Sequence, residues 1–134
     1  MARRDQLNEY DLGLPVPIPP LEERRAQVPA RVWEKLHNVK EGAAALLGSR
    51  LREIRLFGSY ARGDQDDDSD ADVLILTESL EAGEREKLVD ITFEASLGGR
   101  PWLSPLILTV AKLDELREDE KIIAKDLEHD GIVV

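Results

Sequence analysis

Apolar residues recur along the chain at spacings that predict a mixture of helices and strands. Between Val32 and Leu47 they fall at intervals of three and four, which is typical of a helix with one apolar face. Pro29 suits the first turn of this helix, and Gly48 supplies a plausible end. The first predicted element is therefore a long helix that buries one side.

Three short apolar segments predict β-strands. Residues 53–57 alternate between polar and apolar positions, whereas residues 72–76 are almost entirely apolar after the first aspartate. The second pattern is typical of an inner strand that is covered on both faces. Residues 102–110 form the third predicted strand. Pro105 has no N–H to donate, so it should lie at a sheet edge or near the start of its strand.

The remaining segments predict further helices. Ser79 is a candidate cap for a helix that runs to about Leu97, and residues 98–101 form a turn. One or two helices follow between residues 112 and 129, and Gly131 ends them. The order helix, strand, strand, helix, strand, helix predicts an α/β (α+β) domain, in which a small sheet is backed by helices.

The N-terminal residues have a different composition. Residues 11–20 hold four of the seven prolines, which predicts an extended, polyproline-like arm over residues 1–20. This arm is either a free terminus or a segment that packs on the domain or on a partner. The domain itself is then expected over residues 21–134.

Composition narrows the class of protein. The chain has 134 residues, of which 42% are apolar and 34% charged, and this suits one globular domain. It has no cysteine, no apolar run of membrane-spanning length and no signal peptide pattern, so a soluble cytoplasmic protein is expected. The net charge of −10 argues against direct nucleic-acid binding. It leaves open a metal-bound anionic ligand or a basic protein partner.

A pair of aspartates at the entry to the second strand is the first candidate for chemistry. Asp70 and Asp72 flank Ala71, and residues two apart in a strand point to the same side. Their backbones would lie about 7 Å apart. Two such carboxylates repel each other unless a cation lies between them. Mg²⁺ suits this place, because it takes one or two carboxylates together with phosphate oxygens and water.

The preceding segment, "GSYARG" at residues 58–63, offers groups that suit phosphate. Gly58 lets the backbone approach a ligand closely, and Ser59 adds a hydroxyl and an N–H. Arg62 is either a ligand of the phosphates or a surface charge paired with a nearby aspartate. Tyr60 is expected to pack against the domain, and the alternatives are stacking on a base or accepting a nucleotide. The aspartates at 64 and 66–68 are expected to be loop surface.

These two segments together carry a family resemblance. Gly58-Ser59, ten residues, then Asp70-Ala71-Asp72 resembles the Gly-Ser-x10-Asp-x-Asp signature of the nucleotidyltransferase superfamily that includes DNA polymerase beta. The chain looks most like its minimal nucleotidyltransferase branch. The resemblance implies a mixed sheet backed by helices and transfer of a nucleoside monophosphate, AMP from ATP being the first expectation, to a hydroxyl. The implied site residues are Asp70, Asp72 and Ser59 for catalysis, Gly58, Ser59 and Arg62 for the nucleotide, and Asp70 and Asp72 for Mg²⁺.

The resemblance also suggests a partner. Minimal nucleotidyltransferases often pair with a HEPN-domain ribonuclease toxin, and some act as antitoxins by adenylylating it, commonly on a tyrosine. We therefore expect an enzyme that modifies a protein such as a HEPN toxin. The alternative is a weak or inactive nucleotide-binding antitoxin that acts by binding alone.

One expected feature of the superfamily is missing from the sequence. Active members usually have a third carboxylate on a later strand, where it binds the catalytic metal. Residues 102–110 contain no aspartate or glutamate, and Ser104 stands where an acid is expected. Four acids on neighbouring predicted helices are candidates for this role, and no spacing selects among them: Asp90, Glu94, Asp114 and Glu115.

Overall fold

The computed structural model describes residues 18–134. Of the arm predicted over residues 1–20, only the last three residues fall within this range, so the prediction of an extended arm lies almost wholly outside the described residues. Pro20 has an extended backbone, with φ −55° and ψ 153°, and it leads directly into the first helix.

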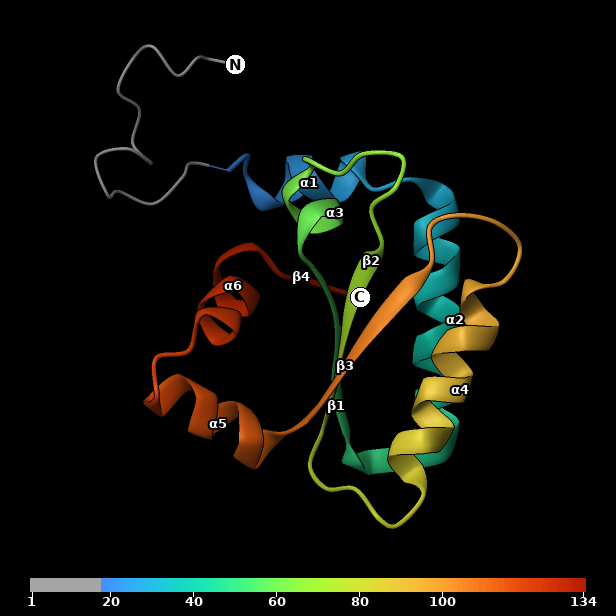
Figure 1. The fold of residues 1–134 in the computed structure, drawn as a ribbon, viewed down its shortest axis with the longest axis vertical. Coiled ribbons are helices and arrows are strands. Elements are labelled where there is room, and N and C mark those ends of the chain that lie inside the picture. The colour runs from blue at the N-terminus through green and yellow to red at the C-terminus, as the bar shows by residue number, and fades with distance from the viewer. Residues whose placement is uncertain (1–17) are drawn as a thin grey trace.

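Four strands form one sheet in the centre of the molecule (Figure 1). In sheet order these are β3 (Leu103–Thr109), β2 (Ala71–Thr77), β1 (Leu51–Phe57) and β4 (Ile132–Val133). β1 is antiparallel to both of its neighbours, whereas β2 and β3 are parallel and are connected through a helix. The sheet is therefore mixed, as the family resemblance implies.

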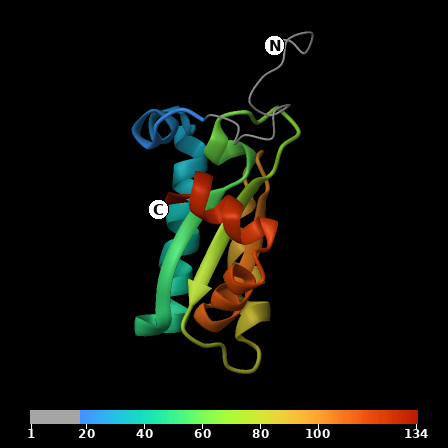
Figure 2. The ribbon, with the colours of Figure 1, turned by 90° about the vertical axis from the view of Figure 1, so that its left-hand side faces the viewer.

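Helices cover both faces of the sheet (Figures 1 and 2). They are α1 (Leu21–Gln27), α2 (Ala30–Leu47), the short 3₁₀ helix η1 (Gly48–Arg50), α3 (Ser59–Arg62), α4 (Glu84–Ser96), α5 (Val110–Glu118) and α6 (Ile122–Asp130). α2 and α4 lie on one face, and α5 and α6 lie on the other. α1 and α3 lie at the end of the sheet where β1 ends and β2 begins.

The periodicity of the sequence matches the two buried layers. The predicted stripe on α2 is buried at Val32, Leu36, Val39, Ala43 and Leu47. In β2, Val73 and Ile75 pack with α2, while Leu74 packs with α5 and α6. Because both faces of β2 are covered, its sequence is apolar from Val73 to Leu76, and the prediction of an inner strand is confirmed.

Three backbone groups of the edge strand β3 are occupied or absent. Pro105 lies in this edge strand, as predicted, and has no N–H. The N–H of Leu103 donates to the hydroxyl of Ser96 at 2.9 Å, and Arg85 donates to the carbonyl of Ile107 at 3.1 Å. Unpaired edge groups invite pairing with another chain, so these three features protect the sheet against strand addition.

Two features of the helices differ from the sequence predictions. α4 begins at Glu84 rather than just after Ser79, and Gly83 occupies its cap position without a side-chain cap bond. The carbonyl of Ser79 instead accepts bonds from Thr77 and Arg50 in the loop after β2. α1 and α3 were not predicted, because α1 carries few apolar residues and α3 has only four residues.

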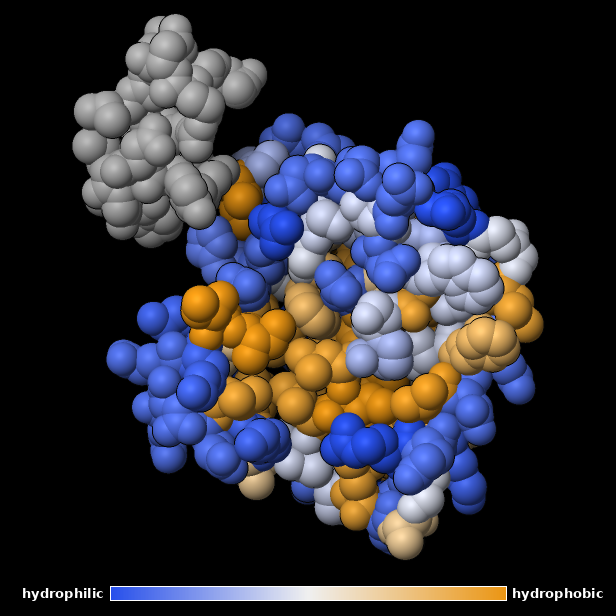
Figure 3. All heavy atoms as spheres, viewed as in Figure 1, coloured by the Kyte–Doolittle hydropathy of each residue, from blue (hydrophilic) through white to orange (hydrophobic). Residues whose placement is uncertain are grey.

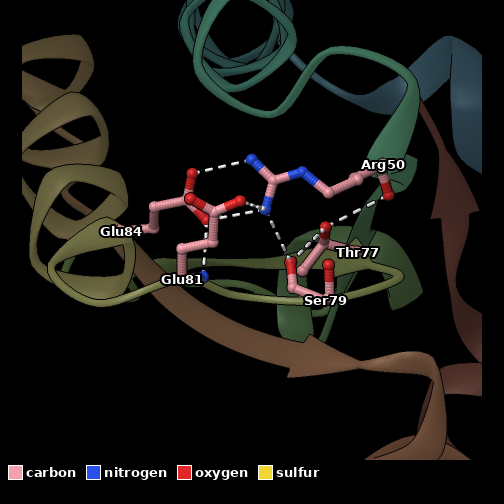
Figure 4. A network of polar contacts seen from close by, with 5 residues as sticks. All are labelled: Arg50, Thr77, Ser79, Glu81 and Glu84. Carbon is pink, nitrogen blue, oxygen red and sulfur yellow. Dashed lines mark hydrogen bonds and ion pairs between the residues drawn. The ribbon is translucent and has the colours of Figure 1, made fainter.

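A network of hydrogen bonds and ion pairs lies at the end of the sheet where β1 begins (Figure 4). The Arg50 guanidinium donates to both carboxylate oxygens of Glu84, each at 2.7 Å, and the Glu81 N–H donates to the same carboxylate. Thr77 donates to the Arg50 carbonyl at 3.1 Å. The hydrogen bonds from Arg50, and then from the backbone of Glu81, lower the pKa of Glu84 to about 2. This network therefore keeps its carboxylate ionised.

In the part of the chain that the structure describes, no helix combines the length and the apolar character needed to cross a membrane.

Candidate active site

A sharp turn at the end of β1 builds the segment that the sequence predicts to hold phosphate. Gly58 has φ +77°, a conformation that side chains disfavour, and α3 begins at the next residue. The carbonyl of Gly58 accepts from the N–H groups of Ala61 and Arg62, both at 3.0 Å. The first N–H groups of a helix have no partner within that helix, so those at the start of α3 are available to an acceptor.

Gly58 also brings this turn against one of the predicted metal ligands. The register of the sheet pairs Phe57 with Asp72, so Asp72 lies beside the end of β1. A Cβ atom added to Gly58 would overlap the Asp72 carboxylate. Glycine is therefore required here for two reasons, its backbone conformation and the close approach of Asp72. The 58–63 turn and the carboxylate form one continuous site.

The two predicted metal ligands differ in exposure. Asp70 is exposed just before β2, whereas Asp72 is the second residue of β2 and is partly buried. Burial raises the pKa of Asp72, and the negative charge of Asp70 raises it further, while Arg62 partly opposes both. A cation between the two carboxylates would remove this penalty. The arrangement therefore fits Mg²⁺, which binds one or two carboxylates and completes its shell with water and phosphate.

Arg62 is engaged in ion pairs. It donates to Asp64 at 3.2 Å and to Asp130, the last residue of α6, at 3.3 Å. Burial by itself would lower the pKa of Arg62, but the bonds to the two aspartates outweigh burial and leave it raised. The structure thus contains the paired arrangement that the sequence analysis gave as one alternative. The part played by Asp130 cannot be predicted from the sequence, because a contact across 68 residues leaves no local pattern.

The other residues of the acidic stretch have structural or surface roles. Tyr60 is only 6% exposed and belongs to the core, as predicted for a packing residue. The aspartates at 64 and 66–68 are exposed. Asp66 and Ser69 close the loop, since the Ser69 hydroxyl donates to the Asp66 carboxylate at 3.1 Å and accepts from the Asp66 N–H at 3.0 Å.

The register of the sheet shows which residue of β3 lies where a third carboxylate would be expected. The parallel register pairs Ser104 with Asp72, and paired residues on neighbouring strands share a face, so Ser104 is the β3 residue beside the site. Asp90 and Glu94 belong to α4, on the opposite face of the sheet from Asp72. Asp114 and Glu115 pair with Arg117 and Lys112 on α5. Within residues 18–134, no three acidic, histidine or cysteine side chains are grouped to hold one metal.

Beyond Asp72 the same face of the sheet is apolar. Leu74 and Leu106 follow Asp72 and Ser104 by two residues on their strands, and both belong to the layer under α5 and α6. Leu76, Leu106 and Ile123 are only partly buried there. Figure 3 shows apolar side chains reaching the surface on this side of the molecule, with hydrophilic residues around them. The carboxylates therefore border an accessible apolar surface.

A glycine-serine turn that lies against the second carboxylate of an Asp-x-Asp pair, on a mixed sheet with helices on both faces, is typical of a nucleotidyltransferase class of domain. In agreement, residues 36–134 match the family model described as "Nucleotidyltransferase domain". The chain belongs to this family. The match covers about three quarters of the chain and includes Gly58, Ser59, Asp70 and Asp72.

Two known proteins are similar to the chain. "Putative protein adenylyltransferase MJ0141" of Methanocaldococcus jannaschii is 39% identical over 77 residues, which cover 57% of this chain and 78% of that protein. A crystal structure of a "putative nucleotidyltransferase" from Sulfolobus solfataricus superposes with a TM-score of 0.42 at 18% identity, covering 78% of this chain and 86% of that one.

Proposed function

We propose that the protein is an Mg²⁺-dependent adenylyltransferase that transfers AMP from ATP to a hydroxyl on a partner protein. The observation that supports this most directly is the contact between Gly58 and the carboxylate of Asp72, which brings a phosphate-binding turn and a metal-binding pair together. The choice of AMP and of a protein acceptor follows the name of the M. jannaschii relative. A cytoplasmic location, where ATP is available, is part of the same proposal.

The reaction is a displacement at the α-phosphorus of ATP. The acceptor oxygen forms a bond to the α-phosphorus, and the bond from this phosphorus to the bridging oxygen of the β-phosphate breaks. Pyrophosphate leaves with the electron pair of that bond, and the hydroxyl proton passes to solvent. Catalysis of such transfers depends on positioning and on stabilisation of negative charge.

Each residue of the site has a separate role in this proposal. The N–H groups at the start of α3 and the Ser59 hydroxyl bind the triphosphate, and Gly58 allows it to approach the backbone. Asp70 and Asp72 hold Mg²⁺, which when bound supplies positive charge to the phosphate oxygens. Arg62 contributes a fixed positive charge beside the turn while it stays paired with Asp130. The apolar surface around Leu106 excludes water from one side of the nucleotide.

A toxin of the HEPN class is the protein acceptor that we propose first. This choice rests on the resemblance to minimal nucleotidyltransferases described above. The net charge of −10 favours association with a basic protein and disfavours direct binding to nucleic acid. In this role the protein would act as an antitoxin that silences its partner by adenylylation.

A second candidate function is supported by Ser104. Because Ser104 occupies the β3 position beside Asp72, the site has two carboxylates where three are usual for active members. A site with two carboxylates can hold Mg²⁺ and ATP without fast turnover. The protein would then be a nucleotide-binding antitoxin that neutralises its partner by binding alone.

A labelling experiment distinguishes the two candidates. The protein is incubated with Mg²⁺ and each α-³²P-labelled nucleoside triphosphate, alone and with the product of the adjacent gene, and transfer is followed on gels. The adenylyltransferase proposal predicts that the label moves from ATP to the partner. Asp70→Asn/Asp72→Asn should abolish this transfer. The matched control, Asp67→Asn/Asp68→Asn, removes two carboxylates from the exposed loop and should keep it.

Each possible outcome of this experiment leads to a different conclusion. If no label moves while the wild-type protein still binds and silences the partner, the enzyme proposal is wrong and the binding proposal holds. If the double variant in the site still transfers label at the wild-type rate, the assignment of Asp70 and Asp72 is wrong. Circular dichroism of each variant checks that the fold is intact.

A further inference from the structure

A buried arginine reaches the 58–63 turn from outside the matched family domain. The family match begins at residue 36, whereas Arg24 lies in α1. Arg24 is only 6% exposed. Its guanidinium donates to the carbonyls of Pro19 at 2.9 Å, Ala61 at 3.1 Å and Asp130 at 2.7 Å. Three parts of the chain therefore meet at one side chain.

Two of these carbonyls lie at the ends of helices. Ala61 is in the last turn of α3, and Asp130 is the last residue of α6. The last carbonyls of a helix have no partner within that helix and carry partial negative charge, so a cation there is favourable. One guanidinium thus satisfies two helix ends, at sequence distances of 37 and 106 residues.

The shape of α3 depends on such contacts. A helix of four residues is far below the length at which helices are stable alone. α1 also approaches the end of α3 through Gln27, whose side-chain oxygen would lie 3.0 Å from a Cβ atom on Gly63. From the other side, Arg62 pairs with Asp130 at 3.3 Å. α3 is consequently held between α1 and the end of α6.

We infer that Arg24 is a positioning residue for nucleotidyl transfer, and that α1 is part of the working enzyme. Arg24 acts through α3. By fixing the carbonyl end of α3, it holds the Gly58-Ser59 turn in its place against Asp72. The inference rests on the proposed function. Without Arg24, only a fraction of molecules would hold the turn in the competent geometry, and the apparent affinity for ATP falls by that fraction.

A matched pair of variants in α1 tests this inference. Arg24→Gln removes the bonds to Ala61 and Asp130. Arg25→Gln removes a neighbouring arginine whose contacts are with β4 and α2, since it donates to the Val133 carbonyl at 2.7 Å and lies over the Trp33 ring. Both variants weaken the packing of α1, and only the first acts on the 58–63 turn.

Two readouts are compared for the full-length protein. The first is amide hydrogen exchange of residues 61–64, whose N–H groups close the turn onto Gly58 and Ser59. The second is KM for ATP and kcat in the labelling assay. Arg24→Gln should speed exchange at these amides at least ~10-fold and raise KM ~10-fold, with a smaller change in kcat. Arg25→Gln should change neither exchange at the turn nor KM.

Several outcomes would overturn the inference. Unchanged exchange at residues 61–64 in Arg24→Gln would do so, as would equal effects of both variants. If Arg24→Gln fails to fold, Arg24→Lys is used, since its ammonium keeps the charge but cannot reach all three carbonyls at once. The exchange measurement needs no ATP. If the wild type transfers no nucleotide, the proposed function fails, and exchange still decides whether Arg24 holds the turn.

Discussion

The two ends of the β1–β2 pair handle charge in opposite ways. At the end where β1 begins, Arg50 binds both oxygens of Glu84, and the pKa of Glu84 is held at about 2. At the end where β1 stops, Asp72 is partly buried beside Asp70, and the pKa of Asp72 is raised. Both ends belong to the same two strands, which pair from Leu51–Thr77 to Phe57–Asp72.

The difference distinguishes carboxylates that are neutralised within the protein from carboxylates that need a bound cation. A carboxylate with a cation and an N–H donor at hydrogen-bond distance is satisfied within the protein. A carboxylate that is partly buried next to another carboxylate is destabilised until a cation from outside arrives. The negative charge at the first end is thus compensated without a ligand, whereas the negative charge at the second end is not. Four changes test this contrast, in order of decreasing effect on transfer.

The largest effect is expected from Asp72→Asn. Removing this carboxylate should lower nucleotidyl transfer by about 10³-fold, because one ligand of the metal is lost. In the absence of metal the same variant should be more stable than the wild type at neutral pH, by about 2–5 °C in Tm. Transfer is measured with labelled ATP, and Tm by calorimetry with EDTA. A wild-type rate in this variant would remove Asp72 from the site.

The sign of the stability change follows from proton binding. The pKa of Asp72 is higher in the folded protein than its ordinary value of 3.8. Between these two values the folded state binds more proton than the unfolded chain, so the contribution of Asp72 to stability declines as pH rises through this range. Added Mg²⁺ should reverse the decline. A Tm that does not respond to Mg²⁺ at neutral pH would argue against a metal at Asp72.

Gly58→Ala should have the next largest effect. Alanine would have to adopt φ +77°, and its Cβ would meet the Asp72 carboxylate. We expect transfer to fall about 10²-fold through misplacement of the turn, and stability to fall by about 1–3 kcal/mol. Gly83→Ala is the control, because Gly83 has φ +83° with open space around it. If both variants lose transfer equally, backbone strain rather than contact with Asp72 explains the loss.

Ser104→Asp should add a negative charge beside Asp72, at the end of the sheet where β1 stops. A carboxylate at this position would stand beside Asp72 and complete a set of three. We expect the rate of transfer to rise about 10-fold. This is less than the rate increase of about 10²–10⁴-fold that a well-positioned general base typically gives. Without metal the protein should become less stable, because a third like charge is added. Ser104→Asn has a similar shape without the charge, so it should leave the rate unchanged, and an increase in that variant would contradict the explanation.

Glu84→Gln should leave nucleotidyl transfer unchanged at neutral pH. It should change how the free energy of unfolding depends on pH in the acidic range. The folded pKa of Glu84, about 2, lies below its ordinary value of 4.5. Its contribution to stability is thus complete above about 4.5 and is lost as pH falls toward 2. Urea unfolding across this range should show a flatter pH dependence in Glu84→Gln. The control is Glu81→Gln, because Glu81 is exposed and lies 3.9 Å from Arg50.

The sequence predicted those elements whose apolar residues follow a regular period. α2 and the three long strands have such periods, and each was located within one or two residues. α1 has a single buried residue, Arg24, so no apolar stripe marks it. The start of α4 was placed too early, because Ser79 has the chemistry of a helix cap but bonds within the preceding loop.

The candidate site was predictable only in part, for a similar reason. The spacing of Gly58-Ser59 and Asp70-Ala71-Asp72 is local, so the sequence shows it directly, and the register of the sheet places Gly58 against Asp72. The roles of Arg24 and Asp130 depend on contacts across 37 to 106 residues. Such contacts arise from tertiary packing and leave no pattern in a single sequence.

The protected edge of β3 has a consequence for recognition and for solubility. Strand addition depends on backbone groups that nearly every sequence has, so an open edge would accept many different chains. Here Pro105, Ser96 and Arg85 occupy or remove three of those groups. We therefore expect recognition along this side to depend on side chains, and edge-to-edge association between copies of the chain to be disfavoured.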